Sequence, residues 1–319
     1  MQRKRILLTG GSGCIGHYLA EALIKETEHE IYLLVRNPGK LLFDYQYREG
    51  ITILEGDLRD IDKYQELLGS INVAILAATS WGGDNEIFEI NVSSTIKLLN
   101  FLDLDVCEQV IYFSTASILD HQNQLLPEAR DIGTSYIKSK YECYTKLSEL
   151  AIAPKITTIF PTLVLGGDQD KPYSHISAGL PKIVEWVNLA RWFQADGSFH
   201  FTHARDIAQI VTYLVNHPPD EVREFVIGND PLTVNQAMEE VCAYFGKRIW
   251  LRIPLSLWLA KIFIKVFYIR MADWDRFCLN YRHFTYKNYV NPAQFGLTNY
   301  CNDLGDALKL AGIVPKKSI

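Results

Sequence analysis

A glycine-rich turn near the start of the chain limits what this sequence can fold into more than any other feature. The pattern G-x-G-x-x-G ends at Gly16, directly after the apolar run Arg5–Thr9 and before a run with helical periodicity. Because glycine has no side chain, backbone amides and the start of the helix can approach a pyrophosphate closely. A dinucleotide is therefore expected to contact the residues of this turn, which are Thr9, Gly10, Gly11, Ser12, Gly13, Cys14, Ile15 and Gly16.

The first half of the chain alternates apolar runs of strand length with longer amphipathic runs. This alternation is typical of an α/β fold with a Rossmann-type, doubly wound parallel sheet covered by helices. We expect strands at Arg5–Thr9, Glu30–Arg36, Thr52–Glu55, Val73–Ala77, Gln109–Ser114 and Lys155–Phe160. We expect helices after Gly16, after Ile61, over 85–102 and over 135–150.

The alternation weakens after Pro161, where glycine and aromatic residues become frequent. A helix over Asp206–Asn216 and a strand over Glu224–Ile227 still fit the earlier pattern. We therefore predict a dinucleotide-binding Rossmann domain and a smaller, mainly C-terminal substrate lobe. The Rossmann domain comprises 1–165 with 196–228, and the lobe comprises 166–195 and 229–319.

The most hydrophobic stretch of the chain is Pro254–Tyr268, and Pro254 fits the first position of a helix. The stretch is too short for a bilayer crossing, which takes about 20 residues, and Lys261 and Lys265 give it one charged stripe. No transmembrane span is expected. Packing within the lobe or as a substrate lid is the leading interpretation, with peripheral membrane contact and a homodimer surface as alternatives.

The charge balance argues against nucleic acid as a partner, since 32 Lys and Arg oppose 37 Asp and Glu, giving a net charge of −5. The six cysteines form no CxxC pair and no zinc-type spacing, which predicts reduced thiols and no metal site. His200 and His203 would point to opposite faces of a strand, which suits packing better than metal binding. The N-terminal residues show no signal-peptide core, so we expect a cytoplasmic protein with a small-molecule substrate.

Residues after the second, third and fourth strands indicate how a dinucleotide would be held. About 20 positions after the glycine turn, NAD-selective proteins carry an acidic residue that binds the adenosine ribose. This sequence has Arg36 there, and a guanidinium can pair with the 2′-phosphate of NADP. We expect a preference for NADP(H), with NAD(H) as the alternative. Asp57 is expected to meet the adenine amino group, and the other expected contacts here are Leu58, Ala77 and Ala78.

A tyrosine and a lysine four residues apart, Tyr136 and Lys140, share one face of an expected helix. An ammonium beside a phenol, together with a positive nicotinamide, stabilises the phenolate and lowers the pKa of the phenol. Tyr136 could then exchange a proton with a substrate hydroxyl or carbonyl. Hydroxyl residues between Ser114 and Ser117 follow the preceding strand, at the sheet edge where ligands of such folds bind.

These elements, in this order, resemble the extended short-chain dehydrogenase/reductase family, which includes NAD-dependent epimerases and dehydratases. The resemblance covers about the first 230 residues. The family's T-G-x-x-G-x-x-G begins at Thr9, its G-D-[LV] begins at Gly56, and its Y-x-x-x-K begins at Tyr136. The resemblance implies that Tyr136 exchanges the proton and that Lys140 holds the ribose. It also implies that Thr115 orients the substrate oxygen, with Ser114 or Ser117 as the alternatives.

Three further segments resemble the family's motifs. Asn91 begins an N-V-x-x-T helix beside the cofactor, Pro161 lies in the segment near the nicotinamide, and Asp206 lies in a later V-x-D-[VI]-A motif. Two departures concern the substrate. The family often has V-Y-G after its strand-end hydroxyl residues, and this sequence has Leu119 there. The family usually has Arg before the proline of the later segment, and this sequence has Phe160 before Pro161. Both changes favour a fairly apolar substrate over a nucleotide-sugar.

We therefore predict an NAD(P)-dependent oxidoreductase that transfers a hydride between NADP(H) and a secondary alcohol or ketone. A nucleotide-sugar epimerase or dehydratase with tightly bound NAD is the first alternative. A nonenzymatic dinucleotide sensor or assembly factor on the same fold is the second. The resemblance also implies a homodimer paired through the helix that carries Tyr136.

Overall fold

One sheet of eight strands organises the molecule, and every neighbouring pair in it is parallel. The computed structural model describes residues 3–221, 223–258 and 270–315. The strand order reverses direction between β1 and β4, which is the switch point of a doubly wound sheet and confirms the predicted fold class. In spatial order the strands are β15 (Tyr289–Val290), β11 (Glu224–Ile227), β6 (Ile156–Pro161), β5 (Gln109–Phe113), β4 (Val73–Leu76), β1 (Arg5–Thr9), β2 (Glu30–Val35) and β3 (Ile51–Glu55).

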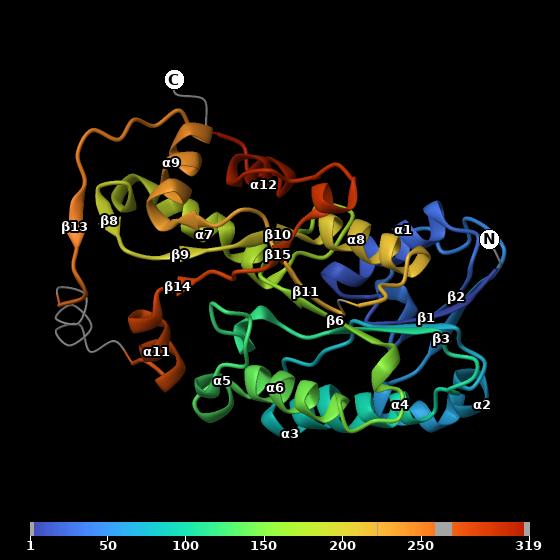
Figure 1. The fold of residues 1–319 in the computed structure, drawn as a ribbon. Helices are drawn as coiled ribbons and strands as arrows, with labels where there is room; N and C mark the ends of the chain where they lie inside the picture. The colour runs from blue at the N-terminus through green and yellow to red at the C-terminus, as the bar shows by residue number, and fades with distance from the viewer. Residues whose placement is uncertain (1–2, 222, 259–269, 316–319) are drawn as a thin grey trace.

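Helices cover both faces of this sheet (Figure 1). α1 (Cys14–Glu26) and α8 (Ala204–Asn216) pack on one face. The other face carries α2 (Gln65–Leu68), α3 (Asp84–Phe88), α4 (Thr95–Asn100) and α6 (Ser135–Leu147). Along β1 the fully buried Ile6 and Leu8 face the first group, whereas Leu7 faces the second. A strand buried on both faces needs apolar residues throughout, which explains its continuous apolar sequence.

The helix expected over 85–102 is not continuous. A π-helical stretch, η3 (Glu89–Ser94), separates α3 from α4. π turns of this kind are frequent at functional sites because they redirect one side chain. Here the stretch contains Asn91, which is buried.

The C-terminal lobe lies beside the carboxyl ends of the sheet strands (Figure 1). Its helices are α7 (His175–Ala190), α9 (Val234–Tyr244), α11 (Asp273–Tyr281) and α12 (Leu304–Leu310). The short strands outside the eight-stranded sheet are β7 (Leu163–Leu165), β8 (Phe193–Ala195), β9 (Ser198–Phe199), β10 (Phe201–His203), β12 (Leu232–Thr233), β13 (Ile253–Leu255) and β14 (His283–Phe284). The remaining short helices are η1 (Pro38–Lys40), η2 (Leu58–Tyr64), η4 (Ala116–Ile118), α5 (Pro127–Asp131), η5 (Ala153–Lys155) and η6 (Pro292–Phe295).

A buried carboxylate connects the two parts. Asp206, at the start of α8, accepts hydrogen bonds from the backbone N–H of Tyr300 at 2.6 Å and of Cys301 at 3.3 Å. Burial raises the pKa of Asp206 to about 6. The residue therefore fastens the returning C-terminal segment to the Rossmann helix.

Pro254 does not begin a helix, and the expectation that it does is wrong. It lies within β13, which pairs with β8 in a two-stranded parallel sheet. Ile253 donates its backbone N–H to the Trp192 carbonyl at 2.8 Å, and an edge pairing of this size tolerates a proline that has no N–H. Most of the hydrophobic stretch, 259–269, lies outside the described residues. Within the described parts of the chain, no helix has both the length and the hydropathy to cross a membrane.

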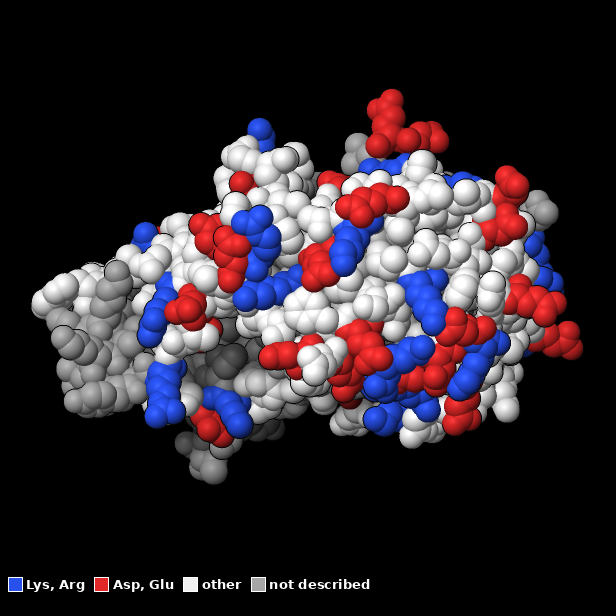
Figure 2. All heavy atoms as spheres, turned by 90° about the horizontal axis from the view of Figure 1, so that it is seen from below, with Lys and Arg blue, Asp and Glu red and all other residues white. Residues whose placement is uncertain are grey.

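Charged side chains of both signs intermingle on the face that carries α4 and α6. Figure 2 shows basic and acidic groups side by side over this surface, without a broad field of one sign. Ion pairs such as Lys97 with Asp62 and Lys146 with Glu142 account for part of this pattern. Such a face is an ordinary solvated surface rather than a nucleic-acid footprint.

Candidate active site

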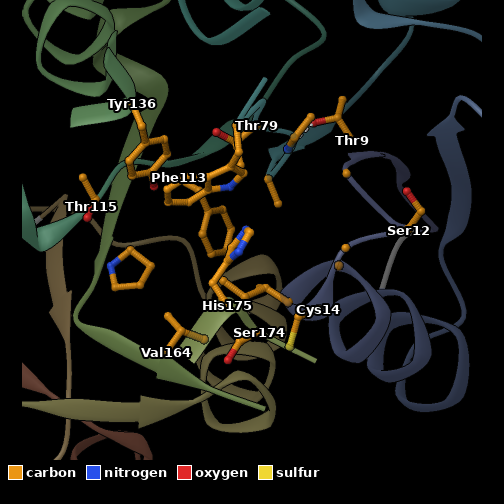
Figure 3. A pocket seen from close by; sticks show the side chains of 18 of the residues that line it. Thr9, Ser12, Cys14, Thr79, Phe113, Thr115, Tyr136, Val164, Ser174 and His175 are labelled. Carbon is orange, nitrogen blue, oxygen red and sulfur yellow. Dashed lines mark hydrogen bonds between the residues drawn. The ribbon is translucent and has the colours of Figure 1, made fainter. Parts of the chain in front are cut away.

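A cavity of about 730 Å³ lies at the carboxyl ends of the central strands. Figure 3 shows Ser12 and Thr9 of the glycine turn at one end of it and Tyr136 and Thr115 at the other. The structure therefore brings the two predicted halves of the site into one cavity. The predicted residues that line it are Thr9, Gly10, Ser12, Gly13, Cys14, Ile15, Gly16, Arg36, Asp57, Leu58, Ala77, Ala78, Thr115, Tyr136, Lys140 and Pro161.

The glycine turn is so tight that side chains are excluded at two positions. Gly10 has a φ of +78°, and a Cβ there would lie 2.6 Å from the Ala78 nitrogen. A Cβ on Gly16 would lie 2.0 Å from the Gly10 carbonyl oxygen. At Gly13 the only near atom would be that same oxygen, at 3.5 Å, so the missing side chain leaves open space. The turn thus offers bare backbone to the cavity, which fits a pyrophosphate.

Helix α1 begins at this turn with its first amides free of a side-chain cap. Gly13 is its N-cap, and the first turn contains no acidic residue. The positive end of the helix dipole therefore points toward the space where a phosphate would lie. Cys14 lines the same space, but burial raises the pKa of its thiol to about 12, so it is a neutral packing group rather than a nucleophile.

Two of the predicted cofactor contacts, Gly11 and Asn91, are not part of the cavity wall. Gly11 is buried against the Val35 side chain. Asn91 accepts hydrogen bonds from the Ser80 backbone N–H at 2.8 Å and the Thr79 hydroxyl at 3.1 Å. It positions the loop after β4, whose Thr79 does line the cavity.

At the adenosine end, the charges are arranged so that Arg36 stays accessible. Its side chain is 66% exposed, and its closest carboxylates are those of Glu86 at 3.9 Å and Asp57 at 4.0 Å. Asp57 is instead engaged by Arg59, whose Nε lies 2.9 Å from the carboxylate. The Arg59 guanidinium is the main reason that the pKa of Asp57 is lowered. Lys40 adds a second cation to the wall on this side.

The Tyr136 hydroxyl lies at the other end of the cavity, beside Thr115. Burial raises the pKa of Tyr136 to about 12, and interaction with the Thr115 side chain, which favours the phenolate, offsets only part of this. Desolvation of the phenol is the larger effect. The lowering predicted from Lys140 together with a positive nicotinamide stays a prediction.

Lys140 lies on the same helix as Tyr136, one turn later, and its side chain is buried. Its ammonium donates a hydrogen bond to the Phe113 carbonyl at 2.7 Å and lies 5.2 Å from the centre of the Tyr112 ring. Burial lowers the pKa of Lys140 to about 8. A cation held in this way lines the cavity in a position to bind a polar ligand group.

Aromatic residues from separate segments meet beside Tyr136. Trp81, in the loop after β4, stacks on Tyr136 with ring centres 3.8 Å apart and an interplanar angle of 18°. His175, the first residue of α7, lies 4.7 Å from the Trp81 ring. Ser174 precedes it as the N-cap, a pattern of helix start that the sequence does display. Trp81, Tyr136 and His175 come from three segments that are far apart in the sequence, so no sequence pattern predicts that their rings meet.

The substrate end of the cavity is poor in cations. Three of the described lining residues are Lys or Arg, namely Arg36, Lys40 and the buried Lys140. Next to Tyr136 the wall is formed by Trp81 and His175, and the cavity lining also includes Leu163, Val164, Tyr173 and Ile176. This wall suits an apolar molecule better than one with a diphosphate.

Histidines elsewhere have structural contacts. His200 is held through both ring nitrogens, by the Asn229 carbonyl at 2.7 Å and the Tyr286 backbone N–H at 3.1 Å. His203 caps α8 by accepting from the Arg205 backbone N–H at 3.1 Å. In the described ranges no group of three or more His, Cys, Asp or Glu is placed to hold a metal ion.

The chain is similar in sequence to known proteins over part of its length. Isoflavone reductase homolog A622 of Nicotiana glauca is 32% identical over 102 residues, 30% of this chain and 32% of its own length. Short-chain dehydrogenase/reductase family 42E member 1 of Homo sapiens is 26% identical over 126 residues, 37% of this chain and 31% of its own length. The matches thus span about a third of these relatives.

Solved structures of similar fold cover nearly the whole chain. The structure of gox2253 superposes with a TM-score of 0.69 at 16% identity, covering 98% of this chain and 100% of the other. dTDP-glucose 4,6-dehydratase from Bacillus anthracis, in complex with NAD, gives a TM-score of 0.65 at 13% identity, covering 97% and 96%. At such identities the likeness concerns the fold alone.

A family profile settles the classification. The profile of the NAD dependent epimerase/dehydratase family matches residues 6–228, the part that contains the glycine turn, Tyr136 and Lys140. The parallel sheet and the fold of the solved relatives are those of extended short-chain dehydrogenases/reductases. The chain belongs to the NAD dependent epimerase/dehydratase family, within the extended short-chain dehydrogenases/reductases.

Proposed function

We propose that this protein is a reductase or dehydrogenase that uses NADP(H) and acts on a secondary alcohol or ketone of fairly apolar character. The observation that carries the proposal is that Tyr136, Thr115 and Lys140 share one cavity with the bare glycine turn. A dinucleotide held at the turn, and a carbonyl compound held beside Tyr136, would meet within that cavity.

The chemical roles follow from the side chains. A bound nicotinamide would supply or accept the hydride. The Tyr136 hydroxyl gives its proton to the substrate oxygen during reduction, and the raised pKa of this phenol, about 12, supports a donor that is protonated beforehand. Thr115, which lines the same end of the cavity as the phenol, orients the same oxygen. Lys140 holds the ribose through its ammonium group.

Preference for NADP(H) is supported by the charges at the adenosine end. Arg59 engages Asp57 at 2.9 Å, so Arg36 at 4.0 Å is left available for a 2′-phosphate. Lys40 lines the same end. Two cations beside an already paired carboxylate favour an added phosphate dianion.

The choice of an apolar ketone over a nucleotide-sugar is supported by the substrate end of the cavity. A diphosphate there would find Lys140 as the one lining cation of the described residues outside the adenosine end, and this ammonium is already bound to the Phe113 carbonyl. The aromatic pair of Trp81 and Tyr136 provides a flat apolar surface instead.

The proposal is tested by a screen of the purified full-length chain. NADPH and NADH binding are compared first, and oxidation of NADPH is then followed with panels of aromatic ketones, terpenoid ketones and nucleotide-sugars. The proposal predicts tighter NADPH binding and turnover with an apolar ketone. Tightly bound NAD with turnover of a nucleotide-sugar, and no response to NADPH, would assign the chain to the epimerases and dehydratases. Dinucleotide binding without turnover of any panel would favour a sensor.

A further inference from the structure

Large apolar side chains are exposed together at one end of the C-terminal lobe. Trp250 is 76% exposed, Trp258 is 71% exposed and Trp186 is 64% exposed. Leaving three tryptophans in water is unusual for a soluble surface and marks an interaction site. We call this surface the lobe-end patch, and its apolar members are Trp186, Leu189, Trp250, Leu251, Ile253 and Trp258.

Direct contacts join the two segments that form the lobe-end patch. The C-terminal half of α7 contributes Trp186 and Leu189, and the segment around β13 contributes the others. Lys247 donates to the Asn188 side chain at 2.7 Å, and Arg191 donates to the carbonyl of Arg248 at 3.1 Å. Figure 1 shows α9, β8 and β13 at the end of the molecule far from β1 to β3.

The segment around β13 carries charge of one sign. Its described residues from Val241 to Trp258 include three basic residues, Lys247, Arg248 and Arg252, and no acidic one, whereas on α7 the exposed Glu185 precedes Trp186. Arg248 lies 5.8 Å from the centre of the Trp250 ring, whereas Arg252 is neutralised by Glu239 at 3.0 Å. No ion pair joins Arg191, Lys247 or Arg248 to a carboxylate of the described residues. Basic side chains without acidic partners, next to exposed tryptophans, are expected to bind a ligand that is anionic at its surface and apolar inside.

We propose that the lobe-end patch docks this protein on the surface of an anionic lipid bilayer. Tryptophan is favoured at the boundary between headgroups and acyl chains, since its ring is apolar and its N–H is polar. Lys and Arg beside it are attracted to anionic headgroups. The combination fits a peripheral, in-plane contact by Trp250 and Trp258 with Lys247 and Arg248 above them.

The position of the cavity is compatible with such docking. The first residues of α7 line the cavity, and the patch occupies the other end of the helix. A helix of 16 residues is about 24 Å long. The cavity therefore stays open to solvent when the lobe-end patch lies on a membrane.

The test is flotation of the full chain with two kinds of vesicle, phosphatidylcholine alone and phosphatidylcholine with phosphatidylglycerol. We expect at least tenfold tighter binding to the anionic vesicles at low salt, with the difference lost at high salt because ions screen the headgroups. Lipids brominated near the headgroup should quench tryptophan fluorescence. Equal binding to both vesicles, or binding to neither, would overturn the proposal.

Variants distinguish vesicle binding through the lobe-end patch from nonspecific adsorption. W250S/W258S and K247E/R248E should each weaken binding to anionic vesicles at least tenfold, while melting temperature and NADPH affinity stay unchanged. The control L42S/L104S removes exposed apolar residues of the Rossmann part and should bind vesicles like the wild type. If W250S/W258S instead halves the sedimenting mass and leaves vesicle binding unchanged, the patch is an interface between two copies and the proposal is wrong.

Discussion

The two ends of the cavity are built by different means. At the dinucleotide end the glycine turn, a run of consecutive residues between Thr9 and Gly16, offers bare backbone to the cavity. At the substrate end single side chains from separate segments meet, among them Trp81, Thr115, Tyr136 and His175. A backbone site is damaged by adding atoms, whereas a side-chain site is damaged by removing them. The expected effects of substitution therefore differ in kind between the two ends.

The largest effect is expected at Tyr136. Tyr136→Phe keeps the ring stacked on Trp81 but removes the proton, so turnover should fall by about 10²- to 10⁴-fold. NADPH affinity should be nearly unchanged, because the dinucleotide end is intact. Steady-state rates and fluorescence titration measure the two quantities. Tyr141→Phe, on the same helix but outside the cavity wall, is the control. A turnover equal to wild type in Tyr136→Phe would remove the phenol from the mechanism.

The second-largest effect is expected from adding one methyl group at the dinucleotide end. In Gly16→Ala the new Cβ would lie 2.0 Å from the Gly10 carbonyl oxygen, so the turn must shift. Overpacking of this kind costs about 1–3 kcal/mol of stability, and NADPH affinity should fall at least tenfold with it. Gly179→Ala, in α7 with no atom near its Cβ, should melt no lower than wild type. Wild-type affinity and melting temperature in Gly16→Ala would show that the turn is less rigid than its geometry implies.

Lys140 lies between the two ends, and its loss should affect both. Lys140→Met should lower turnover and NADPH affinity by roughly ten- to hundredfold, since a charged hydrogen bond to the ribose is worth roughly 1.5–3 kcal/mol. Lys138→Met, on the same helix and outside the cavity wall, should do neither. Unchanged NADPH affinity in Lys140→Met would count against a ribose contact.

Lys140 also predicts a pH dependence. Its pKa in the folded chain, about 8, lies below its ordinary value of 10.5, so between these pH values the unfolded chain binds more protons. The stability of the cofactor-free wild type should therefore rise relative to Lys140→Met as the pH increases from 8 to 10.5. Denaturant unfolding at several pH values measures this difference. NADPH affinity of the wild type should fall over the same range, because the ammonium loses its charge.

The smallest effect is expected at Arg36, which is exposed. Arg36→Ala should reduce the preference for NADPH over NADH by about tenfold, or roughly 1.4 kcal/mol, and leave NADH affinity unchanged. Arg130→Ala, on an exposed residue outside the cavity, serves as the control. A wild-type protein that binds NADH tenfold more tightly than NADPH would contradict the role given to Arg36.

The contrast between the two ends also explains what sequence could predict. The glycine turn and the strands of the sheet follow local rules, and β1 and β11 begin and end at the predicted residues. The stacking of Trp81 on Tyr136 and the approach of His175 depend on the tertiary packing of loops and α7, so periodicity holds no trace of them. The burial that raises the pKa of Tyr136 could not be predicted, because sequence spacing reveals a neighbouring charge but not the desolvation of the phenol.

The central claim is that hydride and proton are exchanged at the Tyr136 end of a cavity whose other end holds NADP(H). The most direct measurement uses NADPH deuterated at the transferable position of the nicotinamide, with the ketone that gives turnover and the full-length chain. Mass spectrometry of the product should find one deuterium on the carbinol carbon. Unlabelled product, or a converted nucleotide-sugar with the label still on the dinucleotide, would contradict the account.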